Sequence, residues 1–222
     1  MNKSTEKYLK FLSKKTKERN EIIQPILDTG QLDRGLEDNI NHPRYFGYKT
    51  GLNTDFESYI SNQITSENSQ IGVLDVGAGR GAFLGDLERK FGKNVSCFGI
   101  SVHNFENVLF TKNHYIVGDA FNNGKDYILD KIPSESMDIV TSQFVSHPKD
   151  FSILLNYFNN VGRILVPGGI SRHLDGFWND KFLNQMVKPL KNSGIEMNCE
   201  YISKMRDCKY VGGNIISLSK KF

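Results

Sequence analysis

The sequence predicts an α/β fold in which a mostly parallel β-sheet carries helices on both faces. From residue 71 onward, short apolar runs alternate with amphipathic segments of helical period. This alternation is typical of a doubly wound sheet, because parallel strands need crossover connections that lie on the faces of the sheet. The last two apolar runs, residues 195–202 and 214–219, have no helical pattern between them. We therefore expect these two strands to be antiparallel neighbours.

Length and composition fit one domain with an N-terminal extension. The chain has 222 residues, of which 38% are apolar and 24% charged, and its formal net charge is +3. This balance supports a buried core without disulfides or metals. We expect a helical extension and lid over residues 1–66 and the α/β core over residues 67–222. The small net charge gives no strong argument for a nucleic-acid partner.

The three cysteines and the hydropathy pattern favour a reduced, cytoplasmic setting. Cys97, Cys199 and Cys208 form no CxxC pair, and an odd number cannot all pair within the chain. No stretch is long and apolar enough to span a bilayer, and no group of His, Cys, Asp or Glu has metal-ligand spacing. We therefore expect neither a membrane partner nor a metal, and the sequence does not indicate an oligomeric state.

The N-terminal part is predicted to consist of a basic helix, an aromatic loop and a second helix. Residues 1–30 have helical spacing of apolar side chains among many lysines, which fits either a solvated helix or a docking surface for an acidic partner. The loop over residues 31–52 contains the aromatic run Tyr45–Tyr48, which either packs on the core or covers a ligand. The helix is expected at residues 55–65, with Thr54 as its N-cap.

The remaining elements follow from the spacing of apolar residues. Strands are expected at residues 71–76, 95–100, 115–117, 137–142, 163–166, 195–202 and 214–219. Helices are expected at residues 81–91, 105–110, 151–161 and 177–190, and a further helical piece should include residues 127–129.

The most informative stretch passes from an apolar strand through alternating glycines into a helix. It reads VLDVGAGRGAFL from residue 73, with Gly77, Gly79 and Gly81 in the turn. Glycine lets a ligand approach the backbone without a Cβ in the way, and the following helix begins with free N–H groups. Asp75, inside the strand, is costly to bury unless it meets donors such as a cationic ligand. The same spacing, with Ala82, also satisfies the dinucleotide pattern GxGxx(G/A), which alone is a weak signal.

The stretch VLDVGAGRG resembles the first motif of the class I S-adenosylmethionine-dependent methyltransferases, an apolar strand and an acid followed by GxGxG. The resemblance runs from about residue 71 to the C-terminus and includes the order of the elements. It implies a Rossmann-like sheet of seven strands, with the last strand antiparallel and inserted beside the preceding one. It also implies S-adenosylmethionine as the cofactor, held by Asp75, Gly77, Ala78, Gly79 and Gly81.

The resemblance extends to the ends of later strands. Asp119 and Ala120 follow the third strand, where an acid of the family receives the adenine amino group; alternatively, Asp119 only caps the next helix. Gln143 follows the fourth strand, in a segment that lines the methyl donor and the acceptor. The stretch 163–169, which ends in Pro-Gly-Gly, resembles the fifth strand and its glycine turn.

The end of the second strand departs from the family pattern. Ser101 stands where the family usually has an acid that binds both ribose hydroxyls. A hydroxyl is a weaker partner than a carboxylate, because charge-assisted hydrogen bonds are stronger. Asn104 or Glu106 could substitute. The departure implies either weaker cofactor affinity or a cofactor binder that has lost activity.

Methyl transfer from a sulfonium needs mainly alignment, and it needs a base only if the acceptor must lose a proton. His147 follows the fourth strand and His173 the fifth. Either is a candidate base, because histidine titrates near neutral pH. His147 precedes Pro148, however, and could serve only to shape a turn.

These observations favour a methyltransferase that acts on an unidentified small molecule or side chain. One alternative is a non-catalytic domain of the same fold that binds a cofactor or a partner. Another is an NAD(P)-dependent oxidoreductase, against which Asp75 and the closing strand pair argue. A nucleic-acid acceptor is compatible with the basic N-terminal helix, although no basic patch interleaved with aromatic residues supports it directly.

Overall fold

The computed structural model describes residues 49, 52–64, 69–101, 105, 107–121, 127–142, 150–175, 180–202 and 213–220. All of them belong to one compact unit that spans residues 44–222. The basic helix expected at residues 1–30 and the aromatic loop Tyr45–Tyr48 lie outside the described residues. The boundary expected between residues 66 and 67 stays a prediction.

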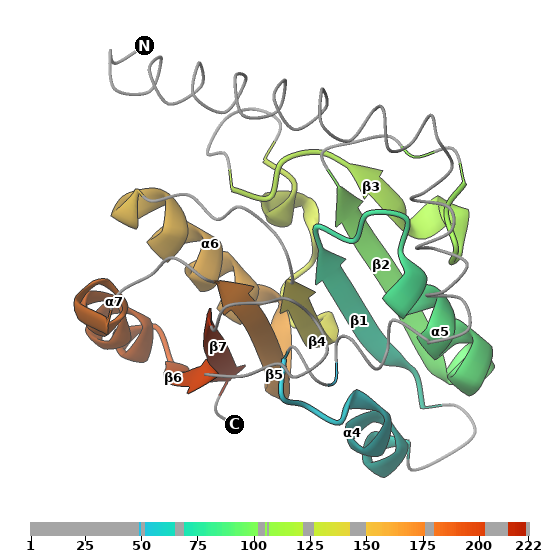
Figure 1. Cartoon of the computed structure of the whole chain (residues 1–222), viewed down its shortest axis with the longest axis horizontal. Helices are drawn as coiled ribbons and strands as arrows, with labels where there is room; N and C mark the ends of the chain where they lie inside the picture. The colour runs from blue at the N-terminus through green and yellow to red at the C-terminus, as the bar shows by residue number, and fades with distance from the viewer. Residues whose placement is uncertain are drawn as a thin grey trace. The chain divides into compact units, whose positions relative to one another are not determined.

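The described residues form a seven-stranded sheet (Figure 1). Its strands are β1 (Ile71–Val76), β2 (Val95–Ser101), β3 (Tyr115–Val117), β4 (Met137–Ser142), β5 (Leu165–Asp175), β6 (Ile195–Ile202) and β7 (Gly213–Lys220). They lie in the order β3-β2-β1-β4-β5-β7-β6. The first five are parallel, and β7 is antiparallel to both β5 and β6, between which it lies. The predicted sheet and its antiparallel last strand are confirmed.

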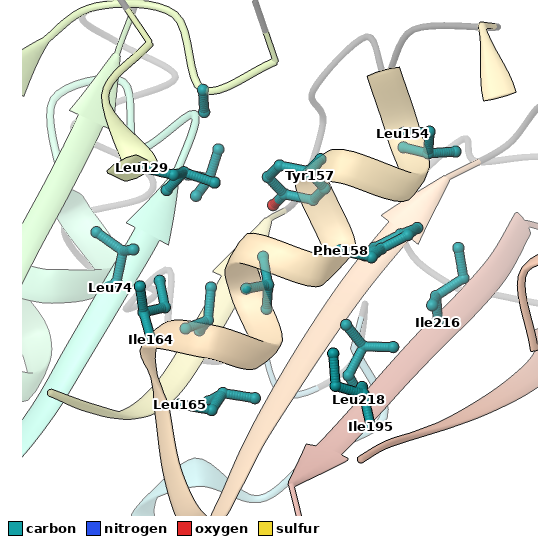
Figure 2. Close-up of a cluster of buried hydrophobic side chains, with 14 of the residues drawn as sticks. Leu74, Leu129, Leu154, Tyr157, Phe158, Ile164, Leu165, Ile195, Ile216 and Leu218 are labelled. Carbon is teal, nitrogen blue, oxygen red and sulfur yellow. The ribbon is translucent and has the colours of Figure 1, made fainter. Parts of the chain in front are cut away.

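Helices pack on both faces of this sheet. In the described part of the chain they are α4 (Phe56–Gln63), α5 (Ala82–Phe91), α6 (Phe151–Ile164) and α7 (Asp180–Asn192). Short 3-10 helices lie at Gly92–Asn94, Lys112–His114 and Leu129–Lys131. Successive residues of β1 point to opposite faces. Val73 therefore packs in one buried cluster with α4 and α5, whereas Leu74 packs in a second cluster with α6 and α7 (Figure 2). No helix in the described part is long and apolar enough to cross a membrane.

Side-chain caps fix where two of these helices begin. Asp55 is the N-cap of α4, where its Oδ1 accepts a hydrogen bond from the Ser58 N–H at 3.1 Å. Thr54, predicted as this cap, lies one residue too early, and its hydroxyl donates to the Leu52 carbonyl instead. Asp150 caps α6 and accepts from the Ser152 and Ile153 N–H groups at 2.9 and 3.3 Å. These bonds satisfy donors that the first turn of a helix leaves free.

Two of the expected helical segments are wrong. The described residues between 105 and 110 form no helix, and the apolar spacing there reflects burial of Phe110 against the core. Tyr127 forms an isolated parallel bridge with Asp119, and only Leu129–Lys131 turns into a short 3-10 helix. In both places the apolar residues serve packing of irregular chain, which sequence spacing alone does not distinguish from a short helix.

The fifth strand was expected too early. Arg163 and Ile164 end α6, and β5 begins at Leu165 and continues to Asp175. Pairing with β4 passes from Met137–Leu165 directly to Ile139–Ile170, so the Pro-Gly-Gly segment forms a bulge inside β5. Gly168 lies there at a φ of +82°, a left-handed conformation that glycine adopts without strain.

Candidate functional site

The strand order places the carboxyl end of β1 at the point where the order of the strands reverses. After β1 the chain adds β2 and β3 on one side, and β4 and β5 then follow on the other side of β1. In open α/β sheets, ligands bind outside the carboxyl ends of the strands at such a reversal. The glycine turn follows β1 at this point, so topology and motif indicate the same site.

All three glycines of the turn have left-handed backbone, with φ values of +81° at Gly77, +56° at Gly79 and +74° at Gly81. The N–H groups of Gly77 and Ala78 both donate to the Ile100 carbonyl of β2, at 2.8 and 3.0 Å. These bonds hold the turn over the end of β2 and fix the direction in which α5 leaves.

Two of these glycines differ in their surroundings. A Cβ on Gly81 would lie 2.2 Å from the Phe110 ring, so this position is required for packing. A Cβ on Gly79 would meet nothing within 4 Å. Gly79 therefore borders open space, as expected where a ligand approaches the backbone closely.

Asp75 lies beneath the turn and is fully buried. Its Oδ1 accepts a hydrogen bond of 2.8 Å from the hydroxyl of Thr141, its partner in register on β4. Asp75 is two residues from Val73 and so points to the face that carries α4 and α5. Sequence reasoning missed Thr141, since strand register is not visible in a single sequence.

Asp119 and Ala120 follow β3, as expected. The Oδ1 of Asp119 accepts from the Phe121 N–H at 2.8 Å, and its backbone bridges to Tyr127. The side chain therefore caps a turn, and no α-helix follows in the described chain before Asp150. Capping occupies one carboxylate oxygen and is compatible with a ligand at the other. Ala120 is buried in the hydrophobic cluster that contains Leu74.

Ser101 is the last residue of β2 and is 5% exposed. Its carbonyl accepts from the Gly118 N–H at 2.9 Å, which joins the ends of β2 and β3. No carboxylate stands at this position. Asn104 and Glu106, the other candidates for a ribose partner, lie outside the described residues, as do Gln143 and His147.

His173 lies in the core on the opposite face from Asp75. It is fully buried, and its Nδ1 lies 3.1 Å from the Ser142 hydroxyl and 3.3 Å from the Tyr157 hydroxyl. The ring also packs edge-on against Tyr157 and Phe158 of α6, the aromatic pair labelled in Figure 2. Burial raises the pKa of Tyr157, which therefore keeps its hydroxyl proton. The ring of His173 has no solvent-exposed surface in this structure, so it offers no direct access to an acceptor. A role for His173 as a base stays a prediction.

Arg172 is a second polar residue that sequence reasoning did not single out. It pairs in register with Thr141, so it points to the same face as Asp75. Its Nε donates to the Thr54 hydroxyl at 2.8 Å. Among the described residues, no group of three or more His, Cys, Asp or Glu side chains is placed to hold a metal ion.

No family model matches the sequence, and no curated protein matches it. Solved structures resemble its fold. One is assigned to the class I S-adenosylmethionine-dependent methyltransferases of Listeria monocytogenes, with a TM-score of 0.53 and 15% identity over 75% of this chain. The methyltransferase domain of the citrinin polyketide synthase and the DszA carbon methyltransferase have TM-scores of 0.51, at 15% and 14% identity over 75% of the chain.

These comparisons show the fold. The seven-stranded, mostly parallel sheet with its antiparallel β7 is the Rossmann-like fold of class I S-adenosylmethionine-dependent methyltransferases. The chain spans only 58%, 51% and 52% of the lengths of these three structures. Because identities near 15% do not carry function, the activity has to be argued from the site itself.

Proposed function

We propose that this protein is an S-adenosylmethionine-dependent methyltransferase whose donor binds at the glycine turn after β1. One observation carries the proposal: a left-handed glycine that borders open space lies at the end of a strand with a buried carboxylate, at the reversal of the strand order. This combination provides room for a ligand to approach the backbone and a negative charge for a cationic group. The shared fold supports the same assignment.

The residues present fit this donor. The turn at Gly77–Gly81 offers close approach to the backbone, and Asp75 offers a carboxylate for the ammonium group of the amino-acid part. Asp119 keeps an oxygen for the adenine amino group, with the Ala120 N–H beside it. Ser101 offers only a hydroxyl near the ribose, which favours weaker binding than a carboxylate would give.

S-adenosylmethionine, when bound, supplies a methyl group that is already activated for displacement. The role left to this chain is to bind and align the two reactants, which contributes about 7–11 kcal/mol in well-oriented reactions. Asp75 and the turn would orient the amino-acid part, and Asp119 would fix the adenine. His147 remains a proposed base for acceptors that must lose a proton, and Gln143 a proposed donor contact.

The acceptor is proposed to be a small molecule or a protein side chain in the cytoplasm. A second candidate function, a non-catalytic cofactor binder, is favoured by one observation, the serine at the end of β2. The two functions differ in a measurable way, since both bind the donor but only the enzyme transfers its methyl group.

Calorimetry with S-adenosylmethionine, S-adenosylhomocysteine and NADH tests the proposal. Binding of the first two and not of NADH is expected. Asp75→Asn keeps an oxygen for Thr141 but removes the charge, so affinity for S-adenosylmethionine should fall about tenfold or more. The matched control is Asp138→Asn. Asp138 is a half-buried carboxylate that accepts from the Gly72 N–H at 2.8 Å, near the opposite end of β1.

In Asp138→Asn the affinity should stay within about twofold of the wild type, because the charge lies far from the turn. Equal affinities in wild type and Asp75→Asn would remove Asp75 from the site. Binding of NADH in place of S-adenosylmethionine would overturn the proposed function. A screen for labelled methyl transfer then separates the enzyme from the non-catalytic binder.

A further inference from the structure

A guanidinium lies in the same row of the sheet as the buried carboxylate of the site. Asp75 pairs in register with Thr141, and Thr141 pairs with Arg172. Directly paired residues on neighbouring strands point to the same face. Strands lie about 4.8 Å apart, so the backbones of Asp75 and Arg172 are separated by roughly 10 Å. The row therefore continues from the glycine turn, past β4, to β5.

The contacts of Arg172 leave much of its hydrogen-bonding capacity unused. Its Nε donates to the Thr54 hydroxyl at 2.8 Å. Neither Nη group hydrogen-bonds to any of the described residues, so four of the five guanidinium donors remain available there. Nearby Glu200 accepts from the Asn53 side-chain amide at 2.8 Å.

The position of Arg172 is costly for a cation. Burial lowers the pKa of Arg172, and the charge of Glu200 only partly offsets this effect. A partly desolvated guanidinium regains free energy when an anion pairs with it, and its two Nη groups match the two oxygens of a carboxylate or a phosphate. The bond from Nε to Thr54 holds this fork in place without occupying it.

We infer that Arg172 binds an anionic group of the methyl acceptor, a carboxylate or a phosphate. The inference rests on the proposed function. The donor is accounted for by the glycine turn and Asp75 on β1, whereas Arg172 lies two strands away on β5. A group held there would place its acceptor over the carboxyl end of β4, between the two. The substrate class would thus be a small acid or a phosphorylated compound.

The test uses the full-length chain with and without S-adenosylhomocysteine, and the probes are inorganic phosphate and acetate, with acetamide as the neutral counterpart. Nuclear magnetic resonance follows the Arg172 Nε–H signal in the wild type and the backbone signals of Ser171 and Leu174 in every variant. Saturable shifts with phosphate or acetate, and none with acetamide, are expected.

Three variants assign the effect to the guanidinium. Arg172→Gln should weaken binding of the anionic probe about tenfold or more, since a charged hydrogen-bonding partner is lost. Arg172→Lys keeps the charge without the fork and should bind more weakly than wild type but better than Arg172→Gln. Arg89→Gln, the matched control, removes an exposed guanidinium that pairs with Asp86 on α5, outside the proposed site, so binding of the anionic probe should stay within about twofold of the wild type.

Affinity for S-adenosylhomocysteine should stay within about twofold in Arg172→Gln. The inference is overturned if neither anion gives a saturable shift, or if Arg172→Gln binds the anions as the wild type does. It is also overturned if Arg172→Gln loses affinity for S-adenosylhomocysteine but not for 5′-methylthioadenosine, because Arg172 would then hold the donor's own carboxylate. An anion site in a chain that binds no S-adenosylhomocysteine would overturn the proposed function instead.

Discussion

Gly79 and Gly81 share a left-handed backbone, but their environments assign them different roles. Gly81 has no room for a side chain because of Phe110, whereas Gly79 borders open space. The fold therefore requires glycine at position 81, whereas the backbone at Gly79 is available to a ligand. In the sequence both are glycines of one motif. Only the neighbouring atoms in the structure show that Gly81 is needed for packing and that Gly79 is open to a ligand.

Gly79→Ala should weaken donor binding without unfolding the protein. A left-handed alanine costs about 1–2 kcal/mol of stability, and its methyl group would occupy the space left for the ligand. Gly194→Ala is the matched control, because Gly194 has a φ of +76° and also borders open space, but it lies between α7 and β6. Thermal unfolding and calorimetry should show similar losses of stability in both variants, and a loss of affinity for S-adenosylmethionine in Gly79→Ala alone. Unchanged affinity there would place the donor elsewhere.

His173 shows that the chemistry of a residue does not by itself tell whether the residue faces the candidate site. His173 was considered for its chemistry, yet the alternation of β5 turns it away from the Asp75 face and into the aromatic core of α6. Its neighbour Arg172 points to the Asp75 face and was not singled out. A shift of one residue along a strand exchanges the two faces of the sheet, so the chemistry of a single position depends on register.

At the scale of elements, the caps and turns determine where the helices begin. Asp150 is exposed, and the hydrogen bonds that its carboxylate accepts from the Ser152 hydroxyl and from the Ser152 and Ile153 N–H groups lower its pKa. Such a group stabilises the fold at pH values above its unfolded pKa of about 4. This contribution is lost as the pH falls through the lower pKa of the folded state.

Asp150→Ala should therefore destabilise the protein by about 1 kcal/mol near neutral pH, with a difference that disappears in acid. Urea unfolding at a series of pH values measures it. Asp130→Ala serves as a control, since Asp130 is an exposed carboxylate for which the described structure shows no hydrogen bond. A loss of stability in Asp150→Ala that persists at low pH would show that the carboxylate is not responsible.

The sequence predicted long periodic elements well and short irregular ones poorly. All seven strands and the helices α4 to α7 have counterparts among the expected segments, because their apolar periodicity reflects which side chains are buried. Around residues 105–110 the described chain buries only Phe110, residues 127–129 are buried without a helical repeat, and the Pro-Gly-Gly bulge belongs inside β5. Their conformation depends on contacts with distant residues, which no local pattern records.

At the scale of the whole molecule, the strand order brings the candidate site together. Asp75 and Gly79 end or follow β1, Thr141 comes from β4, and Asp119 follows β3. The motif after β1 was visible in the sequence because its residues are consecutive. Thr141 and Arg172 join the site only through the pairing of β1, β4 and β5, so they could not be predicted without the sheet register.

The fold is compatible with the proposed methyl transfer but does not identify the acceptor. The acceptor has to be inferred from particular side chains of the site. The three solved structures that resemble this fold are described as methyltransferases, and their identity to this chain is near 15%. A shared fold does not determine the substrate. In the proposed site the acid on β1 is assigned to the donor and the guanidinium of Arg172 on β5 to the acceptor, so the acceptor should be sought among anionic compounds that match Arg172.

A crystal structure of the protein with bound S-adenosylhomocysteine tests the central claim most directly. The amino-acid part should lie against Gly79, with its ammonium group directed to the Asp75 carboxylate and its adenine beside Asp119. If the compound instead occupied another part of the sheet, or if saturated crystals contained none, the glycine turn would not be a donor site and the assignment as a methyltransferase would lose its basis.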